Sequence, residues 1–168
     1  ESDRGDKKFK VFGNAYFKFQ LSDKLNLRTS LGGNYQNTAY HRWRGVEHNR
    51  NGASAAYLEL QDTNRIHMVT ETYFTYDDSF GDHVINAVLG TGAESWETEY
   101  NQSRGGGFTS DLLQTLSAAD PLTVTASSMA YESRLLSFFA RVNYSYADKF
   151  LASVSMRRDG YSVFGSNS

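Results

Sequence analysis

Apolar and polar side chains alternate along most of this 168-residue chain. The clearest alternation runs from Leu135 to Gly165, where two alternating segments flank a short polar turn at 147–149. A period of two puts successive side chains on opposite faces, so each segment is predicted to be a strand with one apolar face. A short turn between two such strands predicts an antiparallel hairpin. The same pattern predicts six strands, at about residues 8–21, 25–37, 66–76, 83–94, 134–146 and 150–158.

The connections between these predicted strands are alternately short and long. Short turns are predicted at 22–24, 77–82 and 147–149, and long loops at about 38–65, 95–133 and 159–168. Within the second long loop, Ser110 is expected to cap a short helix over 110–116, and Pro121 to end it. In an up-and-down sheet, alternate connections lie at the same end, so the short turns share one rim and the long loops the other. Outer-membrane β-barrels have this plan, with short periplasmic turns and long extracellular loops.

The predicted strands have the length and the side chains of membrane-spanning strands. Most are close to the roughly 9–11 residues that cross a bilayer when tilted. The aromatic residues Tyr76, Tyr144, Tyr146 and Phe150 flank short turns, as an interfacial girdle would. Six strands cannot close such a barrel, because roughly eight is the smallest filled size. The polar faces carry charged residues that suit a wide, wet interior: Lys10, Lys18, Arg28, Glu71 and Arg141. We therefore expect an all-β, antiparallel up-and-down transmembrane β-barrel, of which this chain supplies about six strands.

Composition excludes several classes of protein. The net charge is −2 and the isoelectric point about 6.1, which gives no electrostatic case for binding nucleic acid. Cysteine is absent, so no disulfide framework is expected. The mean hydropathy of −0.56 would indicate a soluble chain, but alternating strands average out to polar values. The first ten residues are charged and lack the apolar core of a signal peptide, so the chain is expected to be either mature and soluble or an interior piece of a longer protein.

One segment resembles a known family. The sequence LLSFFARVNYSYADKFLASVSMRRDGYSVFG, residues 135–165, is similar to the barrel signature YFGRVNYxYxDKYLxxxSxRRDGSSxFG of the SusC/RagA family of TonB-linked outer-membrane transporters in Bacteroidetes. Segments 11–35 and 70–94 resemble two further barrel hairpins of that family, and FTSDLL at 108–113 resembles a segment after the next extracellular loop. The run from Arg157 to Gly160 is the most specific match, whereas residues 161–163 depart from the family pattern.

The resemblance implies a nutrient importer of the outer membrane. It implies a barrel of about 22 strands with a plugged lumen, energised through TonB. It also implies a SusD-like surface lipoprotein that covers the extracellular loops as a lid, and substrates that are glycans or peptides. The plug domain and the segment that contacts TonB are expected to be absent from this chain.

The predicted extracellular loops hold the candidate binding residues. They combine aromatic surfaces with hydrogen-bond donors, a mixture suited to sugars or peptides. They are Tyr40, His41, Trp43, Arg44, His48, Trp96 and Tyr100. A solvated loop, or a loop that docks against the lid, is the alternative for each. Likewise, the run Arg157-Arg158-Asp159-Gly160 is either a contact site or the end of a strand closing into a glycine turn.

No pattern indicates an enzyme, a metal site or a cofactor site. The four histidines are not spaced i, i+4, and no two share a short motif with a carboxylate. Gly105-Gly106-Gly107 lacks the Lys-Ser/Thr of a phosphate-binding loop. Serine and histidine residues are scattered, so no catalytic triad is expected. The alternative function is a soluble carbohydrate-binding β-sandwich, which would have shorter strands and turn signals every 8–12 residues or so.

Overall fold

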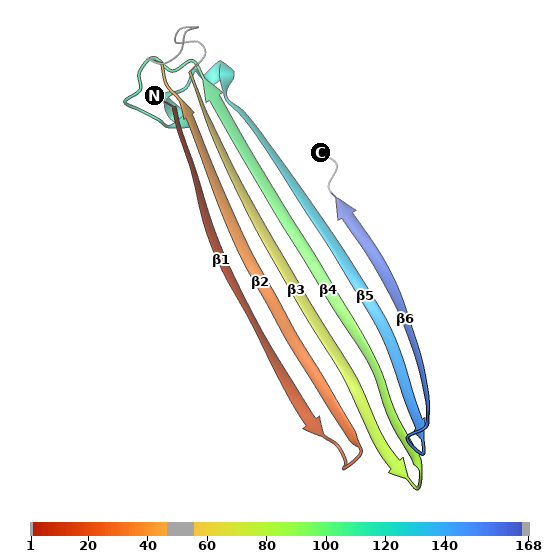
Figure 1. Cartoon of the computed structure of the whole chain (residues 1–168). Coiled ribbons are helices and arrows are strands. Elements are labelled where there is room, and N and C mark those ends of the chain that lie inside the picture. Colours follow the sequence, from red (N-terminus) through yellow and green to blue (C-terminus); the bar gives the residue numbers. More distant parts are fainter. Residues whose placement is uncertain (1, 47–55, 166–168) are drawn as a thin grey trace.

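The chain forms one antiparallel sheet of six strands in sequence order (Figure 1). The structure is a computed structural model that describes residues 2–46 and 56–165. The strands are β1 (Ser2–Gln20), β2 (Leu25–Arg44), β3 (Tyr57–Phe80), β4 (His83–Gly106), β5 (Thr125–Tyr146) and β6 (Phe150–Gly165). Each strand pairs with the next along the chain. Among the described residues, no helix is long and apolar enough to cross a bilayer.

The strands extend well beyond the predicted limits, so the predicted long loops were wrong over much of their length. β3 and β4 each have 24 residues. Strand residues occupy 38–44 and 57–65 of the first predicted loop, 95–106 and 125–133 of the second, and 159–165 of the third. The alternation fades over most of these residues because polar side chains occupy both faces, although Trp43, Leu58 and Leu60 are apolar. The backbone ladder does not depend on side-chain polarity, and β2 stays paired with β3 as far as Arg44 and Tyr57.

The predicted helix over 110–116 is also wrong. The Ser110 hydroxyl does accept a hydrogen bond from the Leu112 amide, at 3.2 Å, but only a local turn follows. Two short 3₁₀ turns lie later, η2 (Leu116–Ala118) and η3 (Pro121–Thr123). Pro121 begins the second of these turns instead of ending a helix, and the Asp120 carboxylate caps it by accepting from the Leu122 amide. A first helical turn is costly to form, and here nothing continues it.

The three short turns lie together at one end of the sheet, opposite the long connections (Figure 1). Gly81, in the turn between β3 and β4, has a φ of +58°, which glycine adopts without steric cost. Neighbouring hairpins are also joined at this rim. The Asp77 amide donates to the Lys24 carbonyl at 2.9 Å, and the Ala147 amide donates to the Asp82 carbonyl at 2.7 Å.

The register separates the sheet into two chemically different faces. Directly opposed residues of neighbouring strands share a face, so the pairing defines rows across all six strands. One such row is entirely apolar: Phe19, Leu27, Phe74, Leu89, Ala140 and Met156. The adjacent row on the other side is mostly polar: Gln20, Asn26, Thr75, Val88, Arg141 and Ser155. We call the side that carries Val142 the apolar face, and the side that carries Arg141 the polar face.

The apolar face is not covered by a second layer. Leu89 is 64% exposed and Val154 71% exposed, although both belong to this face. The described residues form a single sheet, so the two facing sheets of a β-sandwich are not present in that part of the chain. An uncovered apolar sheet of this size needs an apolar solvent or a partner.

Within the described residues, the buried apolar side chains form a cluster at the end of the sheet with the long connections. It consists of Trp43, Ala56, Leu58, Phe108 and Ala119. The connection between β4 and β5 folds back over the sheet there, and the Phe108 ring meets the Trp43 ring edge-on at 4.6 Å between centroids. A Cβ placed on Gly105 would come within 2.8 Å of the Ala119 side chain, so the close packing requires glycine. This connection is therefore a packed structure on one side of the sheet.

Candidate functional site

An oblique apolar belt crosses the apolar face. On successive strands, the apolar positions of this face span residues 9–19, 25–35, 66–76, 85–93, 136–146 and 150–156. We call the end of the sheet away from the short turns the upper end. The upper limit of the belt is Phe9 on β1 and Met156 on β6. Met156 lies in the same row as Phe19, ten residues further along β1 than Phe9. The lower limit shifts in the same direction.

The belt has the dimensions of a bilayer crossed by tilted strands. At about 3.3 Å per residue along strands about 4.8 Å apart, the shift of the upper limit corresponds to a strand tilt of roughly 50°. Strands of membrane barrels are tilted by roughly 35–45°. On β3, the ten steps from Tyr76 to Ile66 rise by about 23 Å at a tilt near 45°, close to the outward apolar band of about 25 Å in such barrels. The hydroxyls of Thr29 and Thr72, inside the belt, bond to each other at 2.8 Å.

Aromatic residues mark the lower edge of the belt, next to the short turns. Phe80, His83, Tyr146 and Phe150 form one row across β3 to β6. Their rings are close, with centroids 4.9 Å apart for His83 and Tyr146. The Tyr144 hydroxyl bonds to the His83 ring nitrogen at 2.6 Å. This arrangement agrees with the predicted girdle at the short-turn rim.

The polar face opposite the belt carries a hydrogen-bonded stripe. His67 bonds through one ring nitrogen to the Asn34 amide, at 3.2 Å, and through the other to a Glu94 carboxylate oxygen, at 3.3 Å. The Trp96 ring stacks on the His67 ring, with centroids 5.0 Å apart and planes 6° from parallel. Lower on the same face, the Arg28 guanidinium lies 4.4 Å from the centre of the Tyr16 ring. Such a face is suited to water or a polar plug.

Above the belt, four arginines gather around two tyrosines on the polar face. The guanidinium carbons of Arg42, Arg44 and Arg104 lie 5.5, 5.8 and 4.5 Å from the centre of the Tyr57 ring. The Arg4 guanidinium lies 5.4 Å from the centre of the Tyr40 ring. We call these six residues the arginine–tyrosine cluster. β1 to β4 each contribute to it, because their registers bring these positions to one face.

The predicted binding residues are divided between the two sides of the sheet. Tyr40, Arg44, Trp96 and Tyr100 lie on the polar face, whereas His41 and Trp43 have the opposite parity. Trp43 is 0% exposed beneath Phe108, so it packs the sheet and offers no surface to a ligand. His48 lies outside the described residues. These predicted residues therefore do not form a single binding loop around Trp43.

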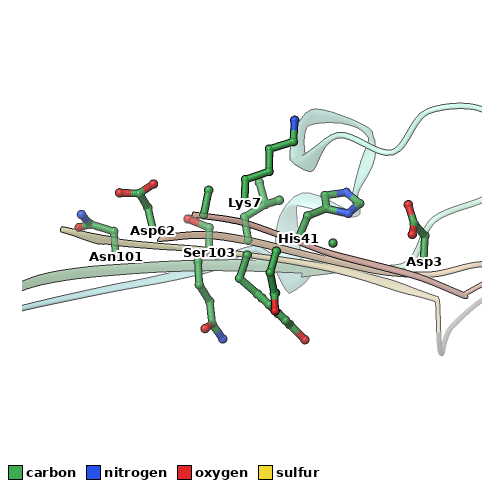
Figure 2. Close-up of a pocket in the computed structure, with 12 residues that line it drawn as sticks. Asp3, Lys7, His41, Asp62, Asn101 and Ser103 are labelled. Atoms are coloured by element: carbon green, nitrogen blue, oxygen red, sulfur yellow. The ribbon is translucent and has the colours of Figure 1, made fainter. Parts of the chain in front are cut away.

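His41 lines a shallow groove on the side that carries Trp43. The groove encloses about 690 Å³ and lies beside the connection between β4 and β5. Figure 2 shows Lys7, His41, Asp62 and Asn101 rising from adjacent strands on the same side of the sheet. These residues lie above the belt on the side of the sheet that carries the apolar face, opposite the arginine–tyrosine cluster.

The run from Arg157 to Gly160 lies inside β6. The alternative of a strand that closes into a glycine turn at Gly160 is therefore wrong, because β6 continues to Gly165 and Gly160 pairs with Leu136. Arg157 donates to the Asp159 carboxylate at 2.9 Å and to the Ser137 hydroxyl at 3.0 Å on the polar face. Arg158 has the parity of the apolar face, two residues beyond the last apolar position of β6. The oblique course of the belt places it at the outer edge.

The described residues contain no group of three or more histidine, cysteine, aspartate or glutamate side chains that could hold a metal ion. Sequence reasoning missed Arg4, Arg42, Tyr57 and Arg104 of the arginine–tyrosine cluster. A signal was available for two of the cluster's arginines: Tyr40, Arg42 and Arg44 alternate, so a strand would place all three on one face. The other members required the cross-strand register.

Comparison with known proteins identifies related sequences. No family model matches the chain. TonB-dependent receptor P39 of Formosa agariphila is 29% identical over 158 residues, which cover 90% of this chain and 15% of that protein. TonB-dependent receptor P3 of the same bacterium is 28% identical over 158 residues, 92% of this chain and 16% of that protein. The chain thus spans about one-sixth of the length of these relatives.

Solved structures show the same fold. A chain of the RagAB peptide transporter superposes with a TM-score of 0.87 at 21% identity, over 95% of this chain and 18% of that one. A chain of the RagAB peptide importer in the open-open state gives a TM-score of 0.89 at 22% identity, over 99% of this chain and 19% of that one. BauA, the ferric preacinetobactin receptor of Acinetobacter baumannii, gives 0.53 at 14% identity, over 99% of this chain and 26% of that one.

Proposed function

We propose that this chain is part of the β-barrel of a TonB-dependent transporter of the SusC/RagA type. We further propose that the complete protein imports nutrients across the bacterial outer membrane. The observation that carries the proposal is the oblique apolar belt on one face of the sheet, backed by a polar face. A wall with these two faces separates hydrocarbon from a wet interior. The sequence relatives, which are named TonB-dependent receptors, support the same conclusion.

In this proposal, the six strands form a section of the barrel wall. The belt spans the bilayer, and the short turns face the periplasm. The upper parts of β2 to β5 continue the wall beyond the outer leaflet and line a vestibule. Tyr40, Arg44, Trp96 and Tyr100 face that interior and remain proposed contacts for the substrate or for the lid. His41 is proposed to contact the lid or the lipid headgroups from outside.

The proposed partners follow from the family resemblance. A SusD-like surface lipoprotein would cover the vestibule, and TonB would engage a plug segment outside this chain. The substrates would be oligosaccharides or peptides. The fold match to chains of RagAB, a peptide transporter, supports the peptide alternative only as an analogy of architecture.

Uptake by the bacterium that encodes the full-length protein tests this function. A deletion strain would be compared with its parent for uptake of a fluorescent oligopeptide mixture and a fluorescent oligosaccharide mixture. We expect the deletion to remove uptake of one mixture, and a protonophore to abolish the same uptake in the parent. Equal uptake of both mixtures by the two strains, or uptake insensitive to the protonophore, would contradict an energised importer.

A further inference from the structure

Four positively charged side chains converge on the polar face above the belt, although the whole chain has a net charge of −2. Arg4 and Arg42 are directly opposed on β1 and β2. Like charges in directly opposed positions destabilise a sheet. The opposed pair Arg4–Arg42 therefore costs stability in the empty wall.

The two nearest carboxylates on this face offset only part of the charge of the four arginines. Glu59 lies between Arg42 and Arg104 in the same row, and Asp6 lies one row below. Glu59 accepts hydrogen bonds from the Gln61 and Gln102 side-chain amides, at 2.9 and 2.6 Å. Within residues 2–46 and 56–165, none of the four guanidinium groups forms an ion pair.

Tyr57 holds three of the guanidinium groups at one place. Each lies within 5.8 Å of the ring centre, in the range of cation–π contacts. Arginine held in this way keeps its planar donor groups free for oxyanions, which it binds through two parallel hydrogen bonds. Arg42 lies seven residues beyond Tyr35, the last belt position on β2, and so about 15 Å above the belt if the strand is tilted near 45°.

We propose that the arginine–tyrosine cluster is a binding site for the oxyanion groups of an acidic substrate as it enters the vestibule. Carboxylate or sulfate groups are the chemistry it would take, carried by an acidic peptide or by an acidic oligosaccharide. This inference rests on the proposed import function, because it assumes that the polar face lines a substrate path. It adds a selection for negative charge that the import function does not require.

Binding by the purified full-length transporter tests the site without depending on transport. Four fluorescent probes would be titrated: a glutamate-rich peptide and its glutamine counterpart, and an oligogalacturonate and a neutral oligosaccharide of equal length. We expect one acidic probe to bind more tightly than its neutral counterpart, with an affinity that falls as salt rises. The double variant Arg42→Gln/Arg104→Gln should weaken that binding by about tenfold or more.

The control variant is Arg65→Gln. It removes an arginine of β3 that lies on the polar face, as the cluster does, but lower in the wall. It should change the affinity by less than about twofold, since Arg65 lies outside the cluster. The milder variant Arg104→Lys keeps the charge but loses the planar fork, and should weaken binding by an intermediate factor. Equal affinity for acidic and neutral probes, or equal losses in Arg65→Gln and the double variant, would overturn the inference. Energised uptake of a neutral substrate with normal rates would then leave the import function intact.

Discussion

Single residues already distinguish the two environments of the sheet. Val142 is 47% exposed on the apolar face, near the middle of the belt on β5. Val142→Arg would put a charge into hydrocarbon, at a cost of about 2–4 kcal/mol near the bilayer midplane. We expect the unfolding free energy of the full-length protein in lipid vesicles to fall by about that amount. Urea titration followed by heat-modifiable migration measures it.

The control for this substitution must come from the polar face. Asn143 is the adjacent residue on that face, and the alternating pattern alone predicts that Asn143→Arg is tolerated. However, its side-chain amide donates to Asn86 at 3.1 Å and its oxygen accepts from Ser153 at 2.8 Å, so arginine there would break two hydrogen bonds. Ser145, on the same face, makes no side-chain hydrogen bond within the described part of the chain. Equal losses in Val142→Arg and Ser145→Arg would contradict the assignment of the faces.

Gly90 allows two aromatic side chains to meet across β4 on the polar face. Tyr73 and Phe139 flank it, with ring centroids 6.4 Å apart. A Cβ on Gly90 would lie 2.6 Å from the Tyr73 Cβ and 2.5 Å from the tip of Phe139. Gly90→Ala should therefore destabilise the protein by about 1–3 kcal/mol through overpacking, measured by the same urea titration.

Gly92 provides a matched comparison, two residues away on the same face and strand. A Cβ there would meet nothing closer than 3.7 Å. Gly92→Ala should be neutral or slightly stabilising, because alanine has less backbone freedom to lose on folding. Equal destabilisation by the two substitutions would show that Gly90 has no special role in the Tyr73–Phe139 contact.

Among whole elements, the hairpins at the short-turn rim are linked by an ion pair. Lys24, in the turn between β1 and β2, lies 2.6 Å from the Asp78 carboxylate of β3. The hydrogen bond from Lys24, with a further one from Tyr76, holds the pKa of Asp78 below its usual value. The same contact with Asp78 raises the pKa of Lys24.

Because of this ion pair, the stability of the folded protein is expected to fall as the pH becomes acidic. Asp78 has a lower pKa in the folded state, so its contribution is complete above the ordinary aspartate pKa of about 3.9 and is lost as the pH falls through the folded value. We expect the wild type to melt at a higher temperature than Asp78→Asn at pH 7, and the difference to disappear in acid. A constant difference between pH 7 and pH 2 would exclude a role for the Asp78 charge.

The sequence predicted the presence and order of the six strands because a period of two is visible wherever one face is apolar. It did not predict their length. Above the belt, segments such as 61–65 are polar on both faces, and only the backbone pairing extends them. The helix expected over 110–116 failed for a related reason. Ser110 forms its local hydrogen bond, but tertiary packing around Phe108 and Ala119 decides the path of this connection.

At the scale of the whole molecule, the candidate site depends on pairings that the sequence does not display. Tyr40 and Arg44 share a face with Arg104, which is sixty residues further along the chain, because β2, β3 and β4 are in register. The same register places Trp43 on the other side, where it becomes buried. Residue type alone grouped Trp43 with Tyr40, whereas strand parity separates them.

The oblique belt is also a property of the whole sheet. On one strand it is a run of alternating apolar residues, and only the six registers together reveal the tilt. Arg158 illustrates the difference. On β6 alone, Arg158 interrupts the apolar face. In the sheet, it lies just outside the belt, at the level where lipid headgroups would begin.

The central claim is that the apolar face meets lipid while the polar face meets water. The chain has no cysteine, so single cysteines at each position from 134 to 146 in the full-length protein can carry a spin label after any cysteine elsewhere has been replaced. In proteoliposomes, oxygen collides most often with labels in lipid, and a nickel chelate with labels in water. We expect a period of two, with oxygen maxima at Leu136, Phe138, Ala140, Val142 and Tyr144. Absence of that alternation, or oxygen maxima at Ser137, Phe139 and Arg141 instead, would contradict the claim.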